Sequence, residues 1–434
     1  FRRKQSDAKT VDMANEDFQV LITADQAWPA FERAVLAADR QISCGFRIFD
    51  YWTKLRSTEG RAIGKTWADL LEHVVRRGVR VRIVLSDFDP VMATSLHELT
   101  WRSMRQATAI QEILGPDLAE RFVVIPALHP ARAGLLPWLT FLPATLRKMR
   151  KRVAELSYAR LTRQAVRLDP SDWPELSTVS HHQKIAVIDR FVVYLGGLDL
   201  NERRFDTVDH HQPAYATWSD VQVLIRGPEA EEAARHLDTF LDEVAGKQVP
   251  REGIQIRRTL SAPRQVRFWA LSPRTVLNEI EQDHVAAFQK AQHLIYIETQ
   301  FFRSRAIARA LADVAREHTD LSLILVLPAL PEDVAFEGNE GLDARYGMAL
   351  QAECLEMVTS GFEDRICLAS PVQPRMAVRE GRDVLAGSPV IHVHNKVLIT
   401  DDDFALVGSA NLNGRSMRWD TEVAVKITQQ SRVA

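Results

Sequence analysis

The chain has 434 residues, of which 46% are hydrophobic and 26% charged, values typical of a folded globular protein and not of a disordered one. Its 55 basic and 57 acidic side chains leave a formal charge of −2, so no global positive field favours nucleic acid, and no nucleic-acid partner is expected. Three widely spaced cysteines form neither a disulfide framework nor a paired-cysteine metal motif, no apolar run is long enough to span a membrane, and the compartment stays open.

Two halves of the chain predict the same order of elements. The first half predicts a helix, a strand, a helix and a strand at residues 28–40, 42–51, 66–77 and 79–85. The second half predicts the same four at residues 284–292, 294–302, 306–318 and 321–327. This alternation favours an α/β fold of two similar α-β-α sandwich lobes. Proline and glycine interrupt the pattern near residues 248–265, so we expect lobes at residues 1–250 and 251–434.

Residues 134–152 combine two kinds of side chain. An apolar run with Trp138 and Phe141 leads directly into five basic residues in the six positions 147–152. Such a combination suits an anionic membrane surface, and a buried helical hairpin with a solvated basic face is the alternative. Because two prolines argue against one continuous helix, we expect a loop at the rim of a cleft.

The clearest sign of duplication appears when His182 is aligned with His394 without a gap. Seven identities then occur over 22 positions, and they fall on His, Lys, Asp, Gly, Leu, Asn and Arg. Duplication of a scaffold alone would preserve the apolar periodicity, but it would not preserve polar residues at fixed offsets. The repeat therefore indicates a duplicated chemical site.

Each copy places a histidine two residues before a lysine, at the start of an apolar, strand-like run. Alternate side chains of a strand share a face, so His182 lies on the same side as Lys184, and His394 on the same side as Lys396. Imidazole can act as a nucleophile or a general acid near neutral pH, and an ammonium group can neutralise a phosphate oxygen. Two such sets in one cleft could perform in-line displacement at phosphorus.

Both copies read His-x-Lys-x4-Asp, and Gly-Gly or Gly-Ser follows at residues 196–197 and 408–409. This doubled motif resembles the phospholipase D superfamily, and with the upstream repeat the resemblance covers most of the chain. It implies a bilobal fold whose motifs meet at a pseudo-twofold interface. It also implies a covalent phosphohistidine intermediate that needs neither a metal nor another cofactor.

The resemblance further assigns roles to single residues. It implies that His182 is the nucleophile and His394 the general acid and base, and that Lys184 and Lys396 neutralise the phosphate. The substrate-binding residues that it implies are Asp199, Asn411, Ser409 and Gly197.

A nucleophilic histidine also needs a carboxylate on its other ring nitrogen. Alignment of residues 218–223 with 420–425 matches Asp220 with Glu422, so we expect these two acids beside the catalytic histidines, with a surface acid at a strand end as the alternative. His392 and His394 could suggest a metal pair, but a metal would occupy a catalytic histidine and no acidic cluster accompanies them. We therefore expect no metal site.

The motif does not select the phosphodiester that is cleaved. Residues 196–201 and 204–207 resemble phosphatidylcholine-cleaving enzymes, and residues 134–152 suit a lipid surface. We expect a monomeric phospholipase D that works on a bilayer or micelle and passes the phosphatidyl group to water or to an alcohol acceptor. The alternatives are a nuclease of the same fold, a phosphatidyltransferase similar to cardiolipin synthase, and a lipid-binding protein without catalysis.

Overall fold

The computed structural model describes residues 17–155, 173–266, 268–335 and 341–433. The first of its two large sheets has the strand order β1 (Phe18–Ile22), β7 (Val221–Arg226), β6 (Val192–Gly196), β5 (Lys184–Ile188), β2 (Gln41–Phe46), β3 (Arg80–Asp87) and β4 (Phe122–Leu128). The second has the order β13 (Ile366–Ala369), β12 (Ser322–Val326), β10 (Leu294–Thr299), β16 (Lys396–Thr400), β17 (Phe404–Gly408), β19 (Glu422–Ile427), β8 (Ile256–Ala262) and β9 (Arg274–Asn278). Apart from β9, the two orders correspond strand by strand, which confirms the expected pair of similar α/β lobes.

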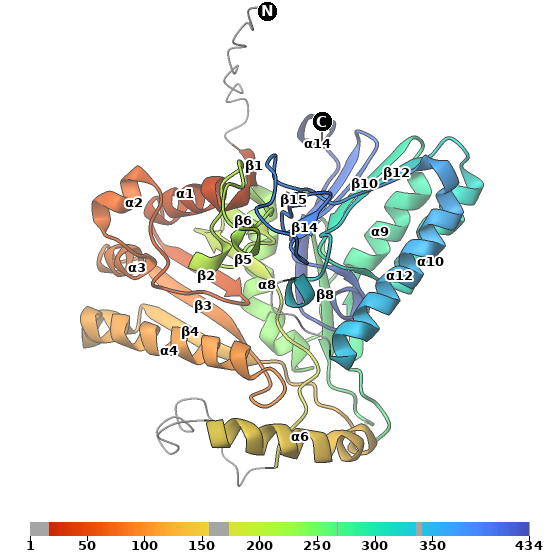
Figure 1. Cartoon of the computed structure of the whole chain (residues 1–434). Coiled ribbons are helices and arrows are strands. Elements are labelled where there is room, and N and C mark those ends of the chain that lie inside the picture. Colours follow the sequence, from red (N-terminus) through yellow and green to blue (C-terminus); the bar gives the residue numbers. More distant parts are fainter. Residues whose placement is uncertain (1–16, 156–172, 267, 336–340, 434) are drawn as a thin grey trace, which may run out of the picture.

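Helices cover the outer face of each sheet (Figure 1). The first sheet packs against α1 (Thr23–Leu36), α3 (Trp67–Arg76) and α4 (Thr94–Leu114), and the second against α9 (Glu279–Lys290), α10 (Arg305–Glu317) and α12 (Leu342–Phe362). The other α-helices among the described residues are α2 (Thr58–Ile63), α5 (Pro116–Ala119), α6 (Leu135–Glu155), α8 (Pro228–Val244), α11 (Glu332–Ala335), α13 (Gly414–Arg418) and α14 (Gln430–Val433). Short pieces of regular structure lie at η1 (Glu202–Arg204), η2 (Ala214–Ala216), η3 (Glu363–Arg365), β11 (Phe302–Arg303), β14 (Val384–Leu385), β15 (Ser388–Pro389) and β18 (Leu412–Asn413).

The inner faces of the two sheets meet in a shared apolar core. Valines and other aliphatic side chains of β5, β6 and β7 pack in one cluster with those of β17 and β19, and α8 joins this cluster through Leu237 and Phe240. Burial of this surface fixes the two lobes against each other. We propose the boundary between the lobes at residue 250, in the segment that joins α8 to β8.

The aspartate of each motif holds the outer end of its own lobe. The carboxylate of Asp189 accepts hydrogen bonds of 2.7 to 2.8 Å from the backbone N–H groups of residues 39–41. The carboxylate of Asp401 accepts bonds of 2.8 to 2.9 Å from those of residues 292–294. Both aspartates therefore tie the turn after a motif strand to the start of the neighbouring antiparallel strand, which is a structural role.

The eight elements predicted from the repeat are present as α1, β2, α3, β3, α9, β10, α10 and β12. The expectation of a loop at residues 134–152 was wrong, because α6 is one helix that contains Pro143. Pro137 lies in its first turn, where a backbone N–H has no helical partner to lose. The interior Pro143 removes one hydrogen bond, and the packing of Met149 and Leu146 against Val91 holds the helix beyond it.

Candidate active site

The backbone of each catalytic histidine is hydrogen-bonded to the opposite lobe. The N–H of His182 donates to the carbonyl of Thr421 at 2.9 Å, and the N–H of His394 donates to the carbonyl of Ser219 at 2.8 Å. Because Ser219 and Thr421 are equivalent in the repeat, these two contacts are related by the pseudo-twofold symmetry of the molecule. The structure thus brings both motifs together at the interface between the lobes.

Each histidine is held by a carboxylate from the other lobe. The Nδ1 atom of His182 lies 2.9 and 3.1 Å from the two carboxylate oxygens of Glu422. The Nδ1 atom of His394 lies 2.6 Å from Oδ2 of Asp220. A carboxylate beside Nδ1 favours the tautomer with its proton there, which leaves Nε2 free to attack phosphorus or to exchange a proton.

The two lysines approach the main chain of their own motif. The Nζ atom of Lys184 donates to the carbonyl of His182 at 2.6 Å and lies 3.8 Å from Oδ2 of Asp199. The Nζ atom of Lys396 donates to the carbonyl of His394 in the same way. Both side chains are buried, and burial lowers the pKa of Lys184 to about 8 and that of Lys396 to about 7. Both ammonium groups therefore gain from an anionic ligand.

Burial also changes the charge of the histidine and carboxylate pairs. It lowers the pKa of both imidazoles well below the usual value, and the nearby ammonium groups lower it further. It raises the pKa of Asp220 to about 7 and that of Glu422 to about 8. A neutral imidazole is the form that can act as a nucleophile, so this environment suits His182 for attack.

Asp199 and Asn411 occupy equivalent positions but have different surroundings. Oδ1 of Asp199 accepts a hydrogen bond of 3.0 Å from the N–H of Ile48, and its Oδ2 lies 3.5 Å from the guanidinium of Arg47. The Nδ2 atom of Asn411 makes a long contact of 3.5 Å to Oε1 of Gln300, and its Oδ1 is buried without a hydrogen-bond partner in the described part of the chain. Asn411 therefore keeps hydrogen-bonding capacity for a ligand, whereas Asp199 is engaged by cations.

Ser409 and Gly197 lie behind the carboxylates. The hydroxyl of Ser409 donates to Oε2 of Glu422, which also lies 3.1 Å from Nδ1 of His182. At Gly197 a Cβ atom would lie 2.0 Å from Oδ1 of Asp220, so only glycine leaves room for that carboxylate. We propose that these two positions orient the acids, in place of the substrate contact expected from the sequence.

Sequence reasoning gave no role to two further side chains near His394. The guanidinium of Arg204 stacks on the ring of Trp218, 3.5 Å from its centroid, and the edge of that ring lies against His394 with the centroids 5.4 Å apart. Arg204 is buried, which lowers its pKa to about 10. It adds a cation to the site, and its only signal in the sequence was the segment Arg204-Phe205-Asp206-Thr207.

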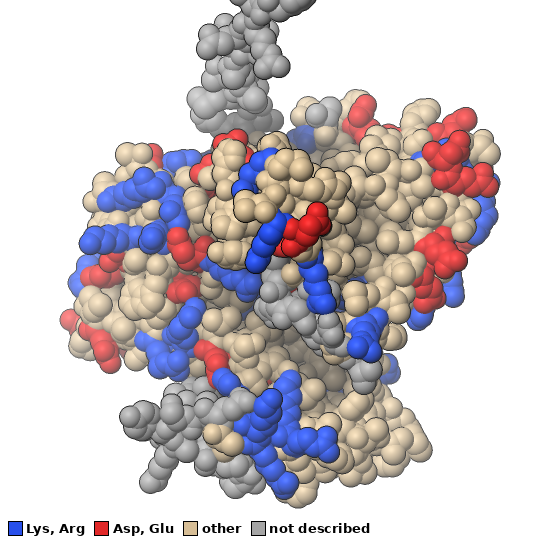
Figure 2. Space-filling model, viewed as in Figure 1, with Lys and Arg blue, Asp and Glu red and all other residues tan. Residues whose placement is uncertain are grey.

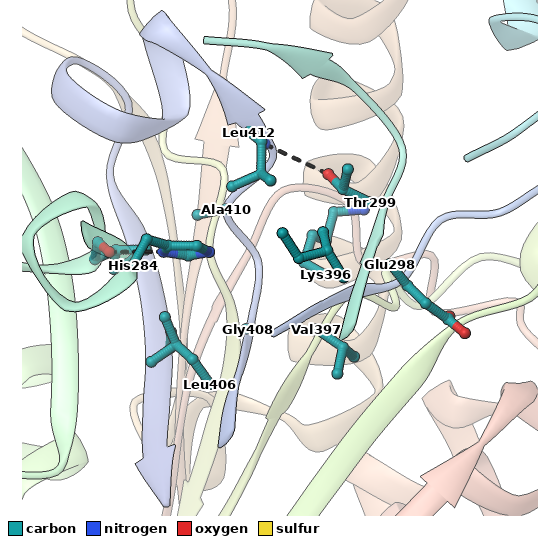
Figure 3. Close-up of a pocket in the computed structure, with 12 residues that line it drawn as sticks. His284, Glu298, Thr299, Lys396, Val397, Leu406, Gly408, Ala410 and Leu412 are labelled. Atoms are coloured by element: carbon teal, nitrogen blue, oxygen red, sulfur yellow. Dashed lines mark hydrogen bonds between the residues drawn. The ribbon is translucent and has the colours of Figure 1, made fainter. Parts of the chain in front are cut away.

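A small cavity of about 10 Å³ lies inside the second lobe, close to Lys396. Figure 3 shows the imidazole of His284 pointing into it from one side, with Thr299 and Leu412 joined by a hydrogen bond across from it. The carboxylate of Glu298 points away from this cavity in Figure 3, and it accepts hydrogen bonds from Asn395 and Tyr296. The cavity has room for about one water molecule and none for a substrate.

The described residues contain neither a metal-binding cluster nor a membrane-spanning helix. None of the described histidine, cysteine, aspartate and glutamate side chains form a group of three or more that could hold a metal ion. None of the helices within residues 17–155, 173–266, 268–335 and 341–433 is long and apolar enough to cross a membrane.

Comparisons of the sequence point to one family. The family model described as "Cardiolipin synthase, PLD-like domain" matches residues 285–434, which include the second motif. The chain is 24% identical over 364 residues to phospholipase D alpha 1 of Oryza sativa subsp. japonica, covering 57% of this chain and 45% of that protein. It is also 24% identical over 349 residues to phospholipase D1 of Schizosaccharomyces pombe, covering 57% and 25%. The chain thus spans less than half the length of these relatives.

The fold has a counterpart among solved structures. The crystal structure of phosphatidylserine synthase from Haemophilus influenzae superposes with a TM-score of 0.54 and 15% identity, covering 96% of this chain and 83% of that one. At this identity the likeness concerns the fold alone, and it agrees with two α/β lobes around one interface. The doubled motif, the matched family model and these relatives support assignment of the chain to the phospholipase D superfamily, whose enzymes act on phosphodiester bonds.

Proposed function

We propose that the protein is a phospholipase D that cleaves glycerophospholipids such as phosphatidylcholine to phosphatidate and the head-group alcohol. The observation that carries this proposal is the crossed arrangement of His182 with Glu422 and His394 with Asp220. Two imidazoles with fixed tautomers and two buried lysines between the lobes supply a nucleophile, an acid and the positive charge that a phosphodiester requires.

In the first step, Nε2 of His182 attacks phosphorus, and the bond from phosphorus to the head-group oxygen breaks. With the anionic phosphodiester bound, His394 takes part as the imidazolium beside the ionised Asp220. Its Nε2–H donates a proton to the departing oxygen, so the alcohol leaves neutral and the phosphatidyl group stays on His182. Lys184 and Lys396 neutralise the non-bridging phosphate oxygens. Glu422 stabilises the positive charge that His182 acquires during the attack.

In the second step, His394 removes a proton from the acceptor, whose oxygen attacks phosphorus and displaces Nε2 of His182. Water as the acceptor yields phosphatidate, and an alcohol yields a new phosphodiester. Hydrolysis and transphosphatidylation therefore share one intermediate and differ only in the acceptor.

A phosphatidyltransferase is the second candidate. The match to the model described as "Cardiolipin synthase, PLD-like domain" and the likeness of fold to a phosphatidylserine synthase favour it. Its chemistry would use the same four residues, with a lipid or amino-acid hydroxyl in place of water. Phospholipase D remains our first proposal because the relatives that match 57% of the chain carry that name.

The test measures choline and phosphatidate release from mixed phosphatidylcholine vesicles with ethanol and a chelator present. We expect phosphatidate and phosphatidylethanol from the wild type, and neither from His182→Ala or His394→Ala. His318→Ala is the matched control, because His318 caps the C-terminal end of α10, a helix on the outer face of the second lobe. Product only with glycerol or a lipid hydroxyl as acceptor would favour the transferase, and cleavage of single-stranded DNA without lipid turnover would refute both lipid candidates.

A further inference from the structure

Exposed apolar side chains lie together on two segments that are far apart in the sequence. One segment is the N-terminal half of α6, and the other is formed by residues 263–266 and 268–273, between β8 and β9. We call their exposed apolar side chains the apolar rim: Leu135, Leu136, Leu139, Phe141, Phe268, Trp269 and Leu271. Trp269 is 73% exposed, more than a structural aromatic residue requires. Contiguous exposed apolar side chains of this kind mark an interaction surface.

Backbone hydrogen bonds join the two segments. The N–H of Gly134 donates to the carbonyl of Ala270 at 2.7 Å, and the N–H of Leu136 donates to the carbonyl of Phe268 at 2.9 Å. The loop thereby accepts hydrogen bonds from the first turn of α6, where N–H groups lack helical partners. The apolar rim is therefore one surface with a defined shape.

Positive charge continues the apolar rim along the same helix. The C-terminal half of α6 carries exposed Arg147, Lys148, Arg150 and Lys151. Figure 2 shows the rim end of this helix without blue or red side chains and the next stretch as a blue cluster. An apolar end beside a basic stretch matches the acyl region and the anionic head groups of a bilayer.

Short hydrogen-bonded links connect the rim to the two segments that carry His182 and Glu422. The hydroxyl of Thr178, four residues before His182, donates to the carbonyl of Leu271 in the loop at 3.2 Å. The hydroxyl of Thr275, just after the loop, donates at 2.8 Å to the carbonyl of Arg418, four residues before Glu422. A partner surface that binds to the rim therefore lies next to the elements that carry His182 and Glu422.

We propose that the apolar rim and the basic half of α6 form the docking surface for an anionic lipid bilayer. Leu139 and Trp269 enter the acyl boundary, and Arg147 and Lys148 face the head groups. The proposal rests on the proposed function, because it names the surface on which the enzyme meets its lipid. The basic stretch favours this occupant over a second copy of the chain, since two copies would bring the same positive charges together.

The test is flotation with vesicles of equal parts phosphatidylcholine and phosphatidylglycerol, in a His182→Ala background. Since that variant has no nucleophile, the binding result does not depend on whether the proposed reaction is correct. We expect Leu139→Glu and Trp269→Glu each to lower the bound fraction about tenfold, and high salt to lower it as well. Phe191→Glu is the matched control, because Phe191 is an exposed aromatic residue at the turn between β5 and β6, at the other end of β5 from His182.

Three outcomes would overturn the proposal: no flotation of the parent, equal flotation of the parent and both rim variants, or equal loss in Phe191→Glu. Circular dichroism verifies that each variant is folded, and Trp269→Ser replaces Trp269→Glu if the latter is not. Light scattering supplies the last discriminator. A dimeric parent that Trp269→Glu converts to a monomer would assign the rim to a second copy and refute the bilayer.

Discussion

The two lobes share one strand order but surround their histidines differently. In the second lobe, the hydroxyl of Ser409 holds Glu422, whereas in the first lobe the equivalent Gly197 leaves only the space that Asp220 fills. The imidazole of His182 is 16% exposed and that of His394 only 4%. The more exposed histidine suits attack on an incoming substrate, and the enclosed one suits proton transfer.

The surroundings of the two catalytic lysines also differ between the lobes. Lys184 has the carboxylate of Asp199 at 3.8 Å, whereas the position equivalent to Asp199 beside Lys396 is the neutral Asn411. Asp199 raises the pKa of Lys184, which lies at about 8 against about 7 for Lys396. A duplicated backbone has thus acquired two different electrostatic environments, as expected for two steps that need a nucleophile and a proton carrier.

The largest effects are predicted for substitutions of the two carboxylates, which should affect different steps of the reaction. Glu422→Gln and Asp220→Asn should each lower kcat by on the order of a thousandfold, because the histidine loses its charged partner. With phosphatidyl-4-nitrophenol, whose leaving group needs little protonation, Asp220→Asn should keep a rapid burst of nitrophenol and Glu422→Gln should lose it. Stopped-flow absorbance measures the burst. Loss of the burst in both variants, or in neither, would contradict different roles for the two pairs.

The next largest effects are predicted for substitutions at Gly197 and Ser409, the positions behind the two carboxylates. Gly197→Ala should lower kcat about a hundredfold and the free energy of unfolding by about 2 kcal/mol, because its Cβ would overlap Oδ1 of Asp220. Ser409→Ala removes one hydrogen bond to Glu422 and should lower the free energy of unfolding by about 1 kcal/mol. For each variant, steady-state kinetics measures kcat, and denaturant unfolding measures the free energy of unfolding. A milder effect at Gly197 than at Ser409 would show that Asp220 has more room than the structure gives it.

The smallest predicted effect comes from a difference between the apolar cores of the two lobes. His284 in the second lobe is equivalent to Phe31 in the first, whose ring stacks on Tyr194 with the centroids 4.4 Å apart. Burial lowers the pKa of His284 below 6.5, so the unfolded chain binds a proton that the folded chain does not. Stability is therefore lost as the pH falls below 6.5, by at most about 1.4 kcal/mol per unit from this group.

His284→Phe removes that contribution, so its Tm should fall less than that of the wild type between neutral and mildly acidic pH. Its Tm at neutral pH should change little, because the ring replaces one of similar size next to a small cavity. Thermal unfolding at the two pH values measures the difference. Parallel losses in both proteins would mean that His284 is protonated in the folded state.

Much of the fold followed from local pattern, and the pairing across the interface did not. The apolar spacing around α1, β2, α9 and β10 predicted both lobes, because each of these elements buries one face. The repeat nominated Asp220 and Glu422, but each acid is equally matched to either histidine in sequence. Only the contacts of Thr421 with His182 and of Ser219 with His394 make the arrangement crossed. Likewise, Pro143 argued against a continuous helix where α6 lies. The contact between Leu136 and Phe268 is long-range, so no local sequence pattern predicts it.

The central claim is that one histidine of the shared site carries the covalent intermediate while the other transfers protons. The most direct measurement is a rapid quench with denaturant at neutral to mildly alkaline pH, where the phosphorus–nitrogen bond survives, during turnover of a phosphatidylcholine substrate, followed by peptide mass spectrometry of His394→Ala and of the wild type. We predict a phosphatidyl adduct on the peptide with His182, enriched in His394→Ala when the leaving group is nitrophenol. An adduct on the peptide with His394 in the wild type, or no adduct on either peptide during turnover, would contradict the account.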